Sequence, residues 1–392
     1  MKGKDGQNKP CLGKIMSINI AVTATFGLEA SVKRELNQLG YNDLKVSDGS
    51  IEFVGEWEDI PRLNINLRCA SRVLVIVGRF TATTFTELFD KTKALDWQNW
   101  ISEDANFIIN GKSVKSTLFS IRDCQSITEK AIIEKLKTKY NTEWFKKCGS
   151  RYNIQFSILK DVVTLTLDTT GAALYKRGYR SLHVEAPLKE TLAAALIELS
   201  FWKKDRVLID CCCGSGTIAI EAAMKARNIA PGIMRGFDSE HWALIPKSAW
   251  KEARQEAKSR ADLDFMPEIY ASDIDENAIR LAKENARRAG VDDCIKFEVK
   301  PMNEVVLPCD YGVCITNPPY AERMGDLKEV EQLYRDMGKT FGSNKTWSFY
   351  AITSLESFEQ LYGRKADKKR KLYNGNVKVD YYQFYGERPP KK

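Results

Sequence analysis

The sequence predicts an α/β protein in which a doubly wound parallel sheet follows two smaller α+β units. In the second half of the chain, expected strands and helices alternate, as the crossover connections of a parallel sheet require. The first 170 residues mix strands, helices and a hairpin instead. The length of 392 residues exceeds one ordinary domain and accommodates two or three. With 43% hydrophobic and 29% charged residues, the composition excludes a fully disordered or fibrous chain.

The two N-terminal units are expected at 17–70 and 71–170. Apolar runs and helical spacing in the first unit predict strands 18–23, 51–54 and 72–80 and helices 28–39 and 60–69, a split β-α-β arrangement that reaches into the next segment. The second unit is expected to contain helices 84–93 and 126–140 and strands 106–111, 152–159 and 162–169. Residues 1–16 are expected to be a disordered leader and 171–180 a glycine-punctuated basic linker.

The third unit, residues 181–392, carries the β/α alternation and a basic C-terminal tail. Expected helices are 188–201, 216–227, 247–260 and 275–289, and expected strands are 206–210, 268–272, 295–299 and 311–316. Residues 71–170 hold 15 basic and 11 acidic residues and residues 360–392 hold 10 and 3, whereas residues 171–359 hold 26 and 29. This distribution favours a module that binds nucleic acid beside a neutral catalytic body. The alternative at this point is a solvated surface with a flexible basic tail.

Several classes of protein are disfavoured by the residues present. The ten cysteines are spread along the chain without a CxxC pair, and the two histidines, His183 and His241, lie far apart, so we expect neither a metal site nor a disulfide framework. Aliphatic runs such as Val73 to Val77 are too short to cross a bilayer, which takes about 20 apolar residues. The N-terminus has no apolar segment of a secretory signal. The expected location is therefore cytoplasmic, away from membranes.

A glycine turn after a buried strand is the first chemical signal. The strand ending at Asp210 runs into Gly214-Ser215-Gly216 and then a helix, so the backbone can approach a ligand closely while the carboxylate accepts hydrogen bonds. The glycine pattern also matches a dinucleotide-binding site in which Asp238 binds the ribose. A third interpretation is a tight turn that binds no ligand. The turn alone does not choose among these interpretations.

Two later signals disfavour a nicotinamide cofactor. Asp273 stands at the tip of the next expected strand, where an acid suits both ribose hydroxyls. A further strand runs into Asn317-Pro318-Pro319-Tyr320, whose prolines fix the backbone so that the Asn317 side-chain oxygen and the Pro318 carbonyl face one amino group. Tyr320 then supplies a stacking face for a flipped base. The alternative is a structural Pro-Pro loop with a core tyrosine.

These motifs, in this order, resemble a class I S-adenosylmethionine-dependent methyltransferase acting on an exocyclic amine. The flanking strings YKRGYR at 175–180, APLKET at 186–191 and NIAPG at 228–232 are similar to the bacterial 23S rRNA guanine-N2 methyltransferases that carry a THUMP domain. The resemblance spans about residues 17–386. It implies a ferredoxin-like domain, a THUMP RNA-binding domain and a Rossmann-like methyltransferase domain, with 23S rRNA or a large-subunit assembly intermediate as partner.

The resemblance also implies roles for individual residues. Asp210, Gly214 and Gly216 would wrap the methionine part of S-adenosylmethionine, with Thr191 near its carboxylate, and Asp273 would bind the ribose. Asn303 stands where the family often has an aspartate at the adenine amine, and Cys211 where it usually has proline. Asn317, Pro318 and Tyr320 would form the target-base site, with Asn317 also bordering the cofactor.

The expected reaction is methyl transfer to the N2 amine of a guanine in RNA, without a metal or a protein nucleophile. Cys314, three residues before Asn317, would suit carbon methylation by a thiol, but its strand position favours a buried structural role. Two alternatives stay open. The Asn-Pro-Pro-Tyr motif also suits methylation of the N6 amine of adenine in RNA or DNA. The protein could also be a non-catalytic RNA-binding factor of ribosome assembly that keeps the methyltransferase fold.

Overall fold

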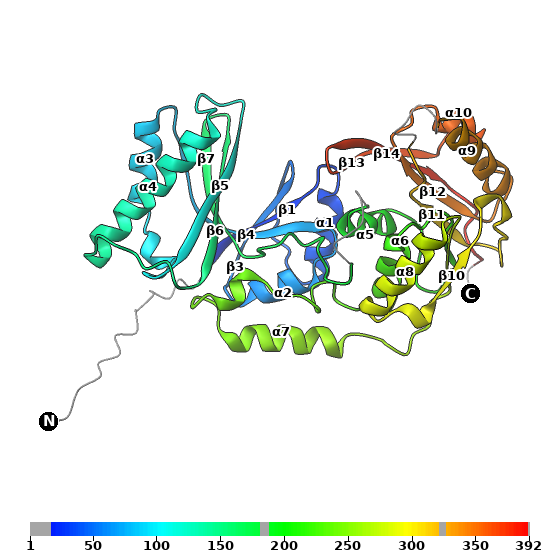
Figure 1. Cartoon of the computed structure of the whole chain (residues 1–392), viewed down its shortest axis with the longest axis horizontal. Coiled ribbons are helices and arrows are strands. Elements are labelled where there is room, and N and C mark those ends of the chain that lie inside the picture. Colours follow the sequence, from blue (N-terminus) through cyan, green and yellow to red (C-terminus); the bar gives the residue numbers. More distant parts are fainter. Residues whose placement is uncertain (1–16, 181–187, 321–326, 391–392) are drawn as a thin grey trace.

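The computed structural model describes residues 17–180, 188–320 and 327–390 and arranges them around two seven-stranded sheets. Figure 1 shows the N-terminal sheet at one end of the elongated molecule and the C-terminal sheet at the other. The expected leader 1–16 lies outside the described residues. None of the described helices combines the length and hydrophobicity that a bilayer span requires.

The first unit has the order β-α-β-β-α-β, and all of its elements except the second strand were predicted from the hydrophobic pattern. Its elements are β1 (Ile18–Ala24), α1 (Glu29–Gln38), β2 (Lys45–Ser47), β3 (Ser50–Gly55), α2 (Asp59–Asn66) and β4 (Ala70–Thr81). Leu28, Val32 and Leu36 are buried at helical spacing beside α1, which explains why this helix packs on the sheet. The short strand β2, which is fully exposed, was not predicted.

The second unit adds two helices and three strands: α3 (Phe85–Ala94), β5 (Asn106–Val114), α4 (Ile121–Tyr140), β6 (Arg151–Leu159) and β7 (Val162–Asp168). Helix α3 starts at a capping box in which the Thr84 hydroxyl accepts from Glu87 N. Helix α4 starts five residues before the expected position 126, because Ser120 caps it. The predicted two-residue turn between β6 and β7 is present.

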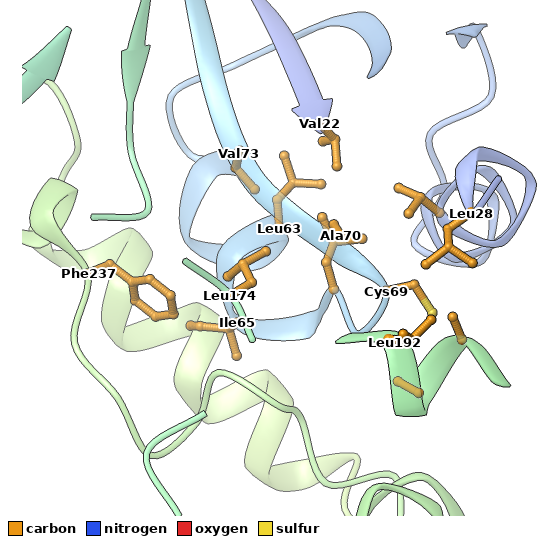
Figure 2. Packing of buried hydrophobic residues seen from close by; sticks show 14 of the residues in the cluster. Val22, Leu28, Leu63, Ile65, Cys69, Ala70, Val73, Leu174, Leu192 and Phe237 are labelled. Carbon is orange, nitrogen blue, oxygen red and sulfur yellow. The ribbon is translucent and has the colours of Figure 1, made fainter. Parts of the chain in front are cut away.

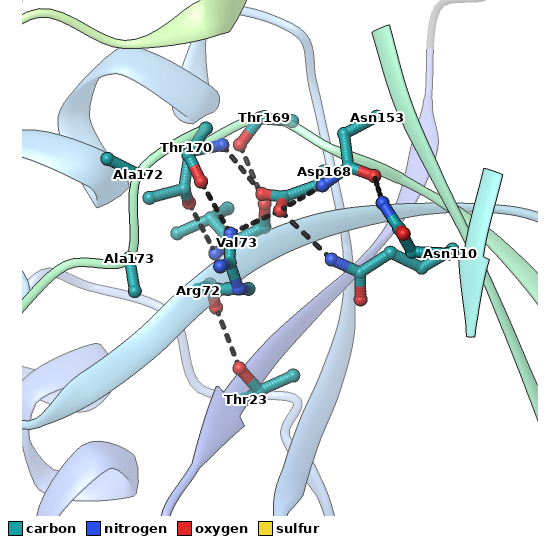
Figure 3. Close-up of polar contacts among 12 residues, drawn as sticks. Thr23, Arg72, Val73, Asn110, Asn153, Asp168, Thr169, Thr170, Ala172 and Ala173 are labelled. Carbon is teal, nitrogen blue, oxygen red and sulfur yellow. Dashed lines mark hydrogen bonds and ion pairs between the residues drawn. The ribbon is translucent and has the colours of Figure 1, made fainter. Parts of the chain in front are cut away.

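One sheet runs through both N-terminal units, in the order β2-β3-β1-β4-β7-β6-β5. Strand β4 pairs with β1 on one side and with β7 on the other. In Figure 3, the fully buried Asp168 carboxylate forms an ion pair with Arg72 and accepts a hydrogen bond from Asn153. It also accepts a hydrogen bond from Gln155. Burial raises the pKa of this carboxyl group. The two units therefore form one hydrogen-bonded body around β4.

The second sheet has the order β10-β9-β8-β11-β12-β14-β13. Its strands are β8 (Leu208–Asp210), β9 (Ile269–Asp273), β10 (Ile295–Val299), β11 (Val313–Thr316), β12 (Ser348–Thr353), β13 (Lys368–Asn374) and β14 (Val377–Phe384). The accompanying helices are α5 (Glu190–Glu198), α6 (Thr217–Ala226), α7 (Lys247–Ser259), α8 (Glu276–Ala289), α9 (Leu327–Phe341) and α10 (Phe358–Tyr362). Strands β8 to β11 are parallel, as the alternation predicts. Strand β12, which was not predicted, is also parallel, whereas β14 is antiparallel to β12. The predicted doubly wound sheet is confirmed.

The basic C-terminal segment, expected as a tail, belongs to this sheet. Strands β13 and β14 form an antiparallel hairpin that pairs with β12. Tyr381 and Tyr382 of β14 are fully buried, and the Tyr381 hydroxyl donates to Leu196 O of α5 at 2.9 Å. These buried aromatic residues anchor the hairpin, so its charged residues are held in place on a strand.

The segment 171–180 connects the two sheets but is packed tightly between them. Figure 2 shows Leu174 beside Ile65, with Phe237 and Leu192 of the C-terminal half approaching the same cluster. The Arg177 guanidinium is 2% exposed and contacts the Glu221 carboxylate of α6, with Nε and Oε1 3.3 Å apart. The segment is thus part of a hydrophobic core that both halves of the protein share. A methyltransferase fragment that starts at residue 181 would lack Arg177 and therefore this ion pair.

Candidate active site

The candidate site lies at the edge where the parallel strands β9, β8 and β11 end. These three strands are neighbours in the sheet, so their carboxyl ends meet at one edge. Asp273 is the last residue of β9, Asp210 is the last residue of β8, and Asn317 directly follows β11. The structure therefore brings together three residues that are spread over more than 100 positions of the sequence.

The glycine turn is joined to Asp273 by a hydrogen bond. Gly214 N donates to Asp273 Oδ2 at 2.8 Å, while Asp273 Oδ1 accepts from Asp275 N at 3.0 Å. Gly214 has a φ of +51°, and a Cβ added there would meet nothing within 4 Å. The space beside this backbone is open, next to a carboxylate.

Gly216 fulfils a different requirement of the same turn. It precedes α6 with a φ of +82°, and an added Cβ would lie 3.0 Å from Ala282 Cβ of α8. Both the left-handed backbone and the close approach of α8 favour glycine. Asn285 of α8 supports the turn by donating from Nδ2 to Ser215 O at 3.1 Å.

Asp210, which ends β8 just before the glycine turn, is 1% exposed. Its Oδ1 accepts from the Thr316 hydroxyl at 3.0 Å, which links the ends of β8 and β11. Burial raises the pKa of the Asp210 carboxyl group well above its ordinary value. A cationic ligand group reaching this carboxylate would stabilise its ionised form.

The Asn317-Pro318-Pro319-Tyr320 loop is held from two sides. Within the loop, the Tyr320 hydroxyl donates to Asn317 Oδ1. From α9, the fully buried Tyr334 donates its hydroxyl to Pro319 O at 2.8 Å and shares a hydrogen bond with Thr353 at the end of β12. Tyr334 was not predicted as a site residue, because helical periodicity marks it as a core residue without showing what its hydroxyl meets.

Two other predicted site residues are less closely connected. Thr191 is buried on α5, and Asn303 is exposed in a short 3-10 helix, Met302–Glu304. Among the described residues, no hydrogen bond joins either of them to the cluster at the strand ends. Their roles at the methionine carboxylate and at the adenine stay predictions.

Cys314 is fully buried in β11, where its Sγ lies 4.0 Å from Cys211 Sγ. Burial raises the pKa of the Cys314 thiol well above its ordinary value. A protonated thiol inside the sheet suits a structural role. Within the described part of the chain, no group of three His, Cys, Asp or Glu residues is arranged to hold a metal ion.

The donor set fits a cofactor with a cationic head and a ribose. Asp210 offers a buried carboxylate, Asp273 offers a partly exposed one, and the turn at Gly214 leaves open space between strand ends. Carboxylates at successive strand tips of an open α/β sheet are suited to an amine and to vicinal hydroxyls.

Comparison with known families decides the assignment. Residues 177–383 match the RMKL-like methyltransferase domain, residues 19–74 match the ferredoxin-like domain of RlmL, and residues 82–168 match the THUMP domain. The chain belongs to the RMKL-like methyltransferases. The resemblance inferred from the motifs and the predicted three-part fold are both confirmed.

Relatives of this RMKL-like methyltransferase support the same family. "Putative RNA methyltransferase YpsC" of Bacillus subtilis is 48% identical over 376 residues, covering 95% of this chain and 97% of the relative. Ribosomal RNA large subunit methyltransferase K/L of Shewanella baltica is 33% identical over 374 residues, but this chain spans only 52% of its length. The structure of SMU.472 complexed with SAH has a TM-score of 0.90 and 44% identity, covering 96% of this chain and 100% of that one.

Replacing Asp273 by alanine in this RMKL-like methyltransferase is expected to weaken S-adenosylmethionine binding by about 1–3 kcal/mol, because buried ribose hydroxyls would lose their acceptor. Titration calorimetry measures the change. Asp275→Ala is the matched control, since this carboxylate caps α8 by accepting from Asn277 N at 2.9 Å. Equal cofactor affinity in wild type and Asp273→Ala would contradict the ribose role.

Proposed function

We propose that this protein methylates the exocyclic N2 amine of a guanine in 23S rRNA, using S-adenosylmethionine as the methyl donor. The observation that carries the proposal is the Asn317-Pro318-Pro319-Tyr320 loop, which follows β11 beside the carboxylates at the ends of β8 and β9. The THUMP match and the large-subunit K/L relatives support RNA, and ribosomal RNA in particular, as the substrate.

The protein is a methyltransferase by family, and S-adenosylmethionine is its cofactor, in keeping with the SAH bound to its relative SMU.472. Bound S-adenosylmethionine supplies a methyl group on a sulfonium, a reactive electrophile that needs no metal or protein nucleophile. In our proposal, Asp210, Gly214, Gly216 and Thr191 hold its methionine part, Asp273 holds the ribose, and Asn303 holds the adenine.

The proposed task of Asn317 and Pro318 is to prepare the amine. Conjugation with the purine ties up the nitrogen lone pair. Hydrogen bonds from the amine to Asn317 Oδ1 and to the Pro318 carbonyl favour a pyramidal nitrogen whose lone pair is free to attack. This interaction strengthens in the transition state, so it raises the rate more than the affinity.

The proposed task of Tyr320 is to stack on the target base. In the structure, its hydroxyl donates to Asn317 Oδ1, the same atom that is proposed to accept from the amine. The base amine would thus replace or join the tyrosine hydroxyl at this oxygen as the guanine enters. Tyr334 keeps the loop backbone in place during this exchange through its bond to Pro319 O.

Tyr320→Ala is expected to raise the KM for RNA by about 5- to 150-fold, the range for losing one base-aromatic stack. Tyr320→Phe should keep most of the activity, because the ring stays and Asn317 Oδ1 becomes free for the amine. Steady-state methylation of rRNA from a strain lacking the gene measures both variants. Equal loss in the two variants would contradict stacking and assign the contribution to the hydroxyl.

The substrate is tested by mapping methylation in the same strain. Nucleoside mass spectrometry of its 23S rRNA should show a loss of N2-methylguanosine, restored when the wild-type gene is supplied. A loss of N6-methyladenosine instead would establish the adenine alternative, which the Asn-Pro-Pro-Tyr loop also suits. Normal methylation of all RNA, together with no S-adenosylmethionine binding, would indicate a non-catalytic assembly factor. A cytoplasmic location stays a prediction from the sequence.

A further inference from the structure

The tip of the β13–β14 hairpin presents a positively charged surface that the methyl-transfer site does not use. Tyr373 pairs with Lys378 across the hairpin, and Lys371 lies two residues before Tyr373, so the three side chains share one face. All three residues are exposed. We call Lys371, Tyr373 and Lys378 the hairpin tip.

Strand register places the hairpin tip at the catalytic edge of the sheet. β12 is parallel to β11, with Thr316 opposite Ala351, and its last residue, Thr353, pairs with Asp380 of β14. Residues 377–379 therefore extend past the end of β12, on the side where Asn317 follows β11. The hairpin tip and the proposed base site are at the same edge.

The hairpin tip also touches the N-terminal sheet. Phe26, in the loop after β1, meets the Tyr373 ring edge-to-face with centroids 6.3 Å apart. Gly27 packs against the hairpin backbone, since an added Cβ would lie 3.0 Å from Lys371 O. Figure 1 shows β13 reaching from the C-terminal sheet towards β1 and α1. The exposed rings of Phe26 and Tyr373 therefore lie side by side where the hairpin meets the N-terminal unit.

The hairpin tip keeps a net positive charge, although Asp380 stands opposite Lys371 in the strand register. Elsewhere on this segment, Lys369 pairs with Asp380 at 3.1 Å and Arg364 with Asp367 at 2.8 Å. In the part of the chain that the structure describes, Lys371 and Lys378 have no such carboxylate partner. Phe26 is 56% exposed and Tyr373 is 37% exposed, so both rings are accessible from solvent.

We propose that the hairpin tip and Phe26 bind a single-stranded segment of the RNA substrate next to the target nucleotide. The two lysines contact phosphates, and a flanking base stacks on Tyr373 and Phe26. Proteins that bind single-stranded nucleic acid combine positively charged side chains along the phosphate backbone with aromatic rings on which the bases stack. The inference rests on the proposed function in that the substrate is RNA, and it places a second RNA contact outside the THUMP domain.

The test measures binding of the full-length protein to a 23S rRNA transcript over a range of salt concentrations. Lys371→Gln/Lys378→Gln should raise Kd about 10-fold and reduce the slope of log K against log salt by about 1.4, which corresponds to two single-strand phosphate contacts. The matched control is Lys251→Gln/Lys258→Gln, which changes two exposed lysines of α7. The control should have the same Kd and the same slope of log K against log salt as the wild type.

Tyr373 is tested with two variants, because it also packs against Phe26. Tyr373→Ala should raise Kd about 10-fold, within the range for one lost stack, while Tyr373→Phe should bind like the wild type. If the lysine pair behaves like its α7 control, the inference is wrong, and a loss confined to Tyr373→Ala then reflects packing between the sheets.

The same measurements separate this inference from the proposed function. A wild type that methylates a 23S guanine, combined with hairpin variants that match the control, overturns the inference alone. A wild type that binds the transcript without methylating guanine overturns the proposed function, and weaker binding by the lysine variant still supports the inference. A wild type that binds no RNA overturns both.

Discussion

Arg177→Met is expected to lower the free energy of unfolding by about 3–5 kcal/mol, the cost of leaving one charge of a buried ion pair without its partner. Arg177 is 2% exposed and Glu221 is 1% exposed. The guanidinium also donates to Leu174 O at 2.9 Å and to Arg68 O, so the change affects both sheets. Chemical denaturation measures the loss.

A double variant separates lost charge pairing from lost packing. Arg177→Met/Glu221→Leu should be less destabilised than Arg177→Met, because no carboxylate stays buried without its cation. The exposed pair of Arg335 and Glu331 on α9 provides the control, and Arg335→Met should change stability by less than about 1 kcal/mol. A loss below 1 kcal/mol for Arg177→Met would contradict the structural importance of the buried pair.

Asn317→Ala is expected to reduce the rate of methyl transfer by about 10²-fold or more while S-adenosylmethionine binding persists. The change removes one preorganised acceptor from the amine and leaves Asp210 and Asp273 intact. Single-turnover methylation with saturating cofactor and RNA measures the rate, and calorimetry checks the cofactor affinity. Nearly full turnover in Asn317→Ala would rule out the proposed activation of the amine.

Asn317→Asp refines this experiment. The carboxylate keeps an acceptor at the same place, so this variant should retain more activity than Asn317→Ala. The Tyr320 hydroxyl can also donate to an aspartate there, which keeps the loop contact seen in the structure. Equal rates in the two variants would mean that the amide group contributes more than its acceptor oxygen.

The sequence predicted the parallel strands β8 to β11 and the residues of the candidate site because both are local patterns. The strand ending at Asp210 and the loop starting at Asn317 are each recognisable within a few residues, and parallel strands bring their ends together. The roles of Thr191 and Asn303, by contrast, rest on the family resemblance alone.

The hairpin and the packed connection could not be predicted in the same way. Strand β13 contains four consecutive basic residues, and Leu372 alone among its seven residues is buried, so its sequence is typical of a solvated segment. Lysine on an edge strand discourages pairing with other chains, which makes such a strand hard to recognise. Arg177 also lies in a glycine-punctuated basic stretch, and its burial depends on Glu221, 44 residues away.

The continuity of the N-terminal sheet through β4 has a consequence for how the protein selects its target. Strand β4 is common to both N-terminal units, and the Arg177 connection fixes this sheet against α6. Because this packing joins the two halves, a ligand anchored on the N-terminal sheet would be presented to the Asn317 loop at a distance set by the fold. An RNA whose target nucleotide lies at another spacing from the anchored part would have to deform in order to react. We therefore expect substrate choice to depend on the three-dimensional shape of the RNA as well as on the base that enters the site.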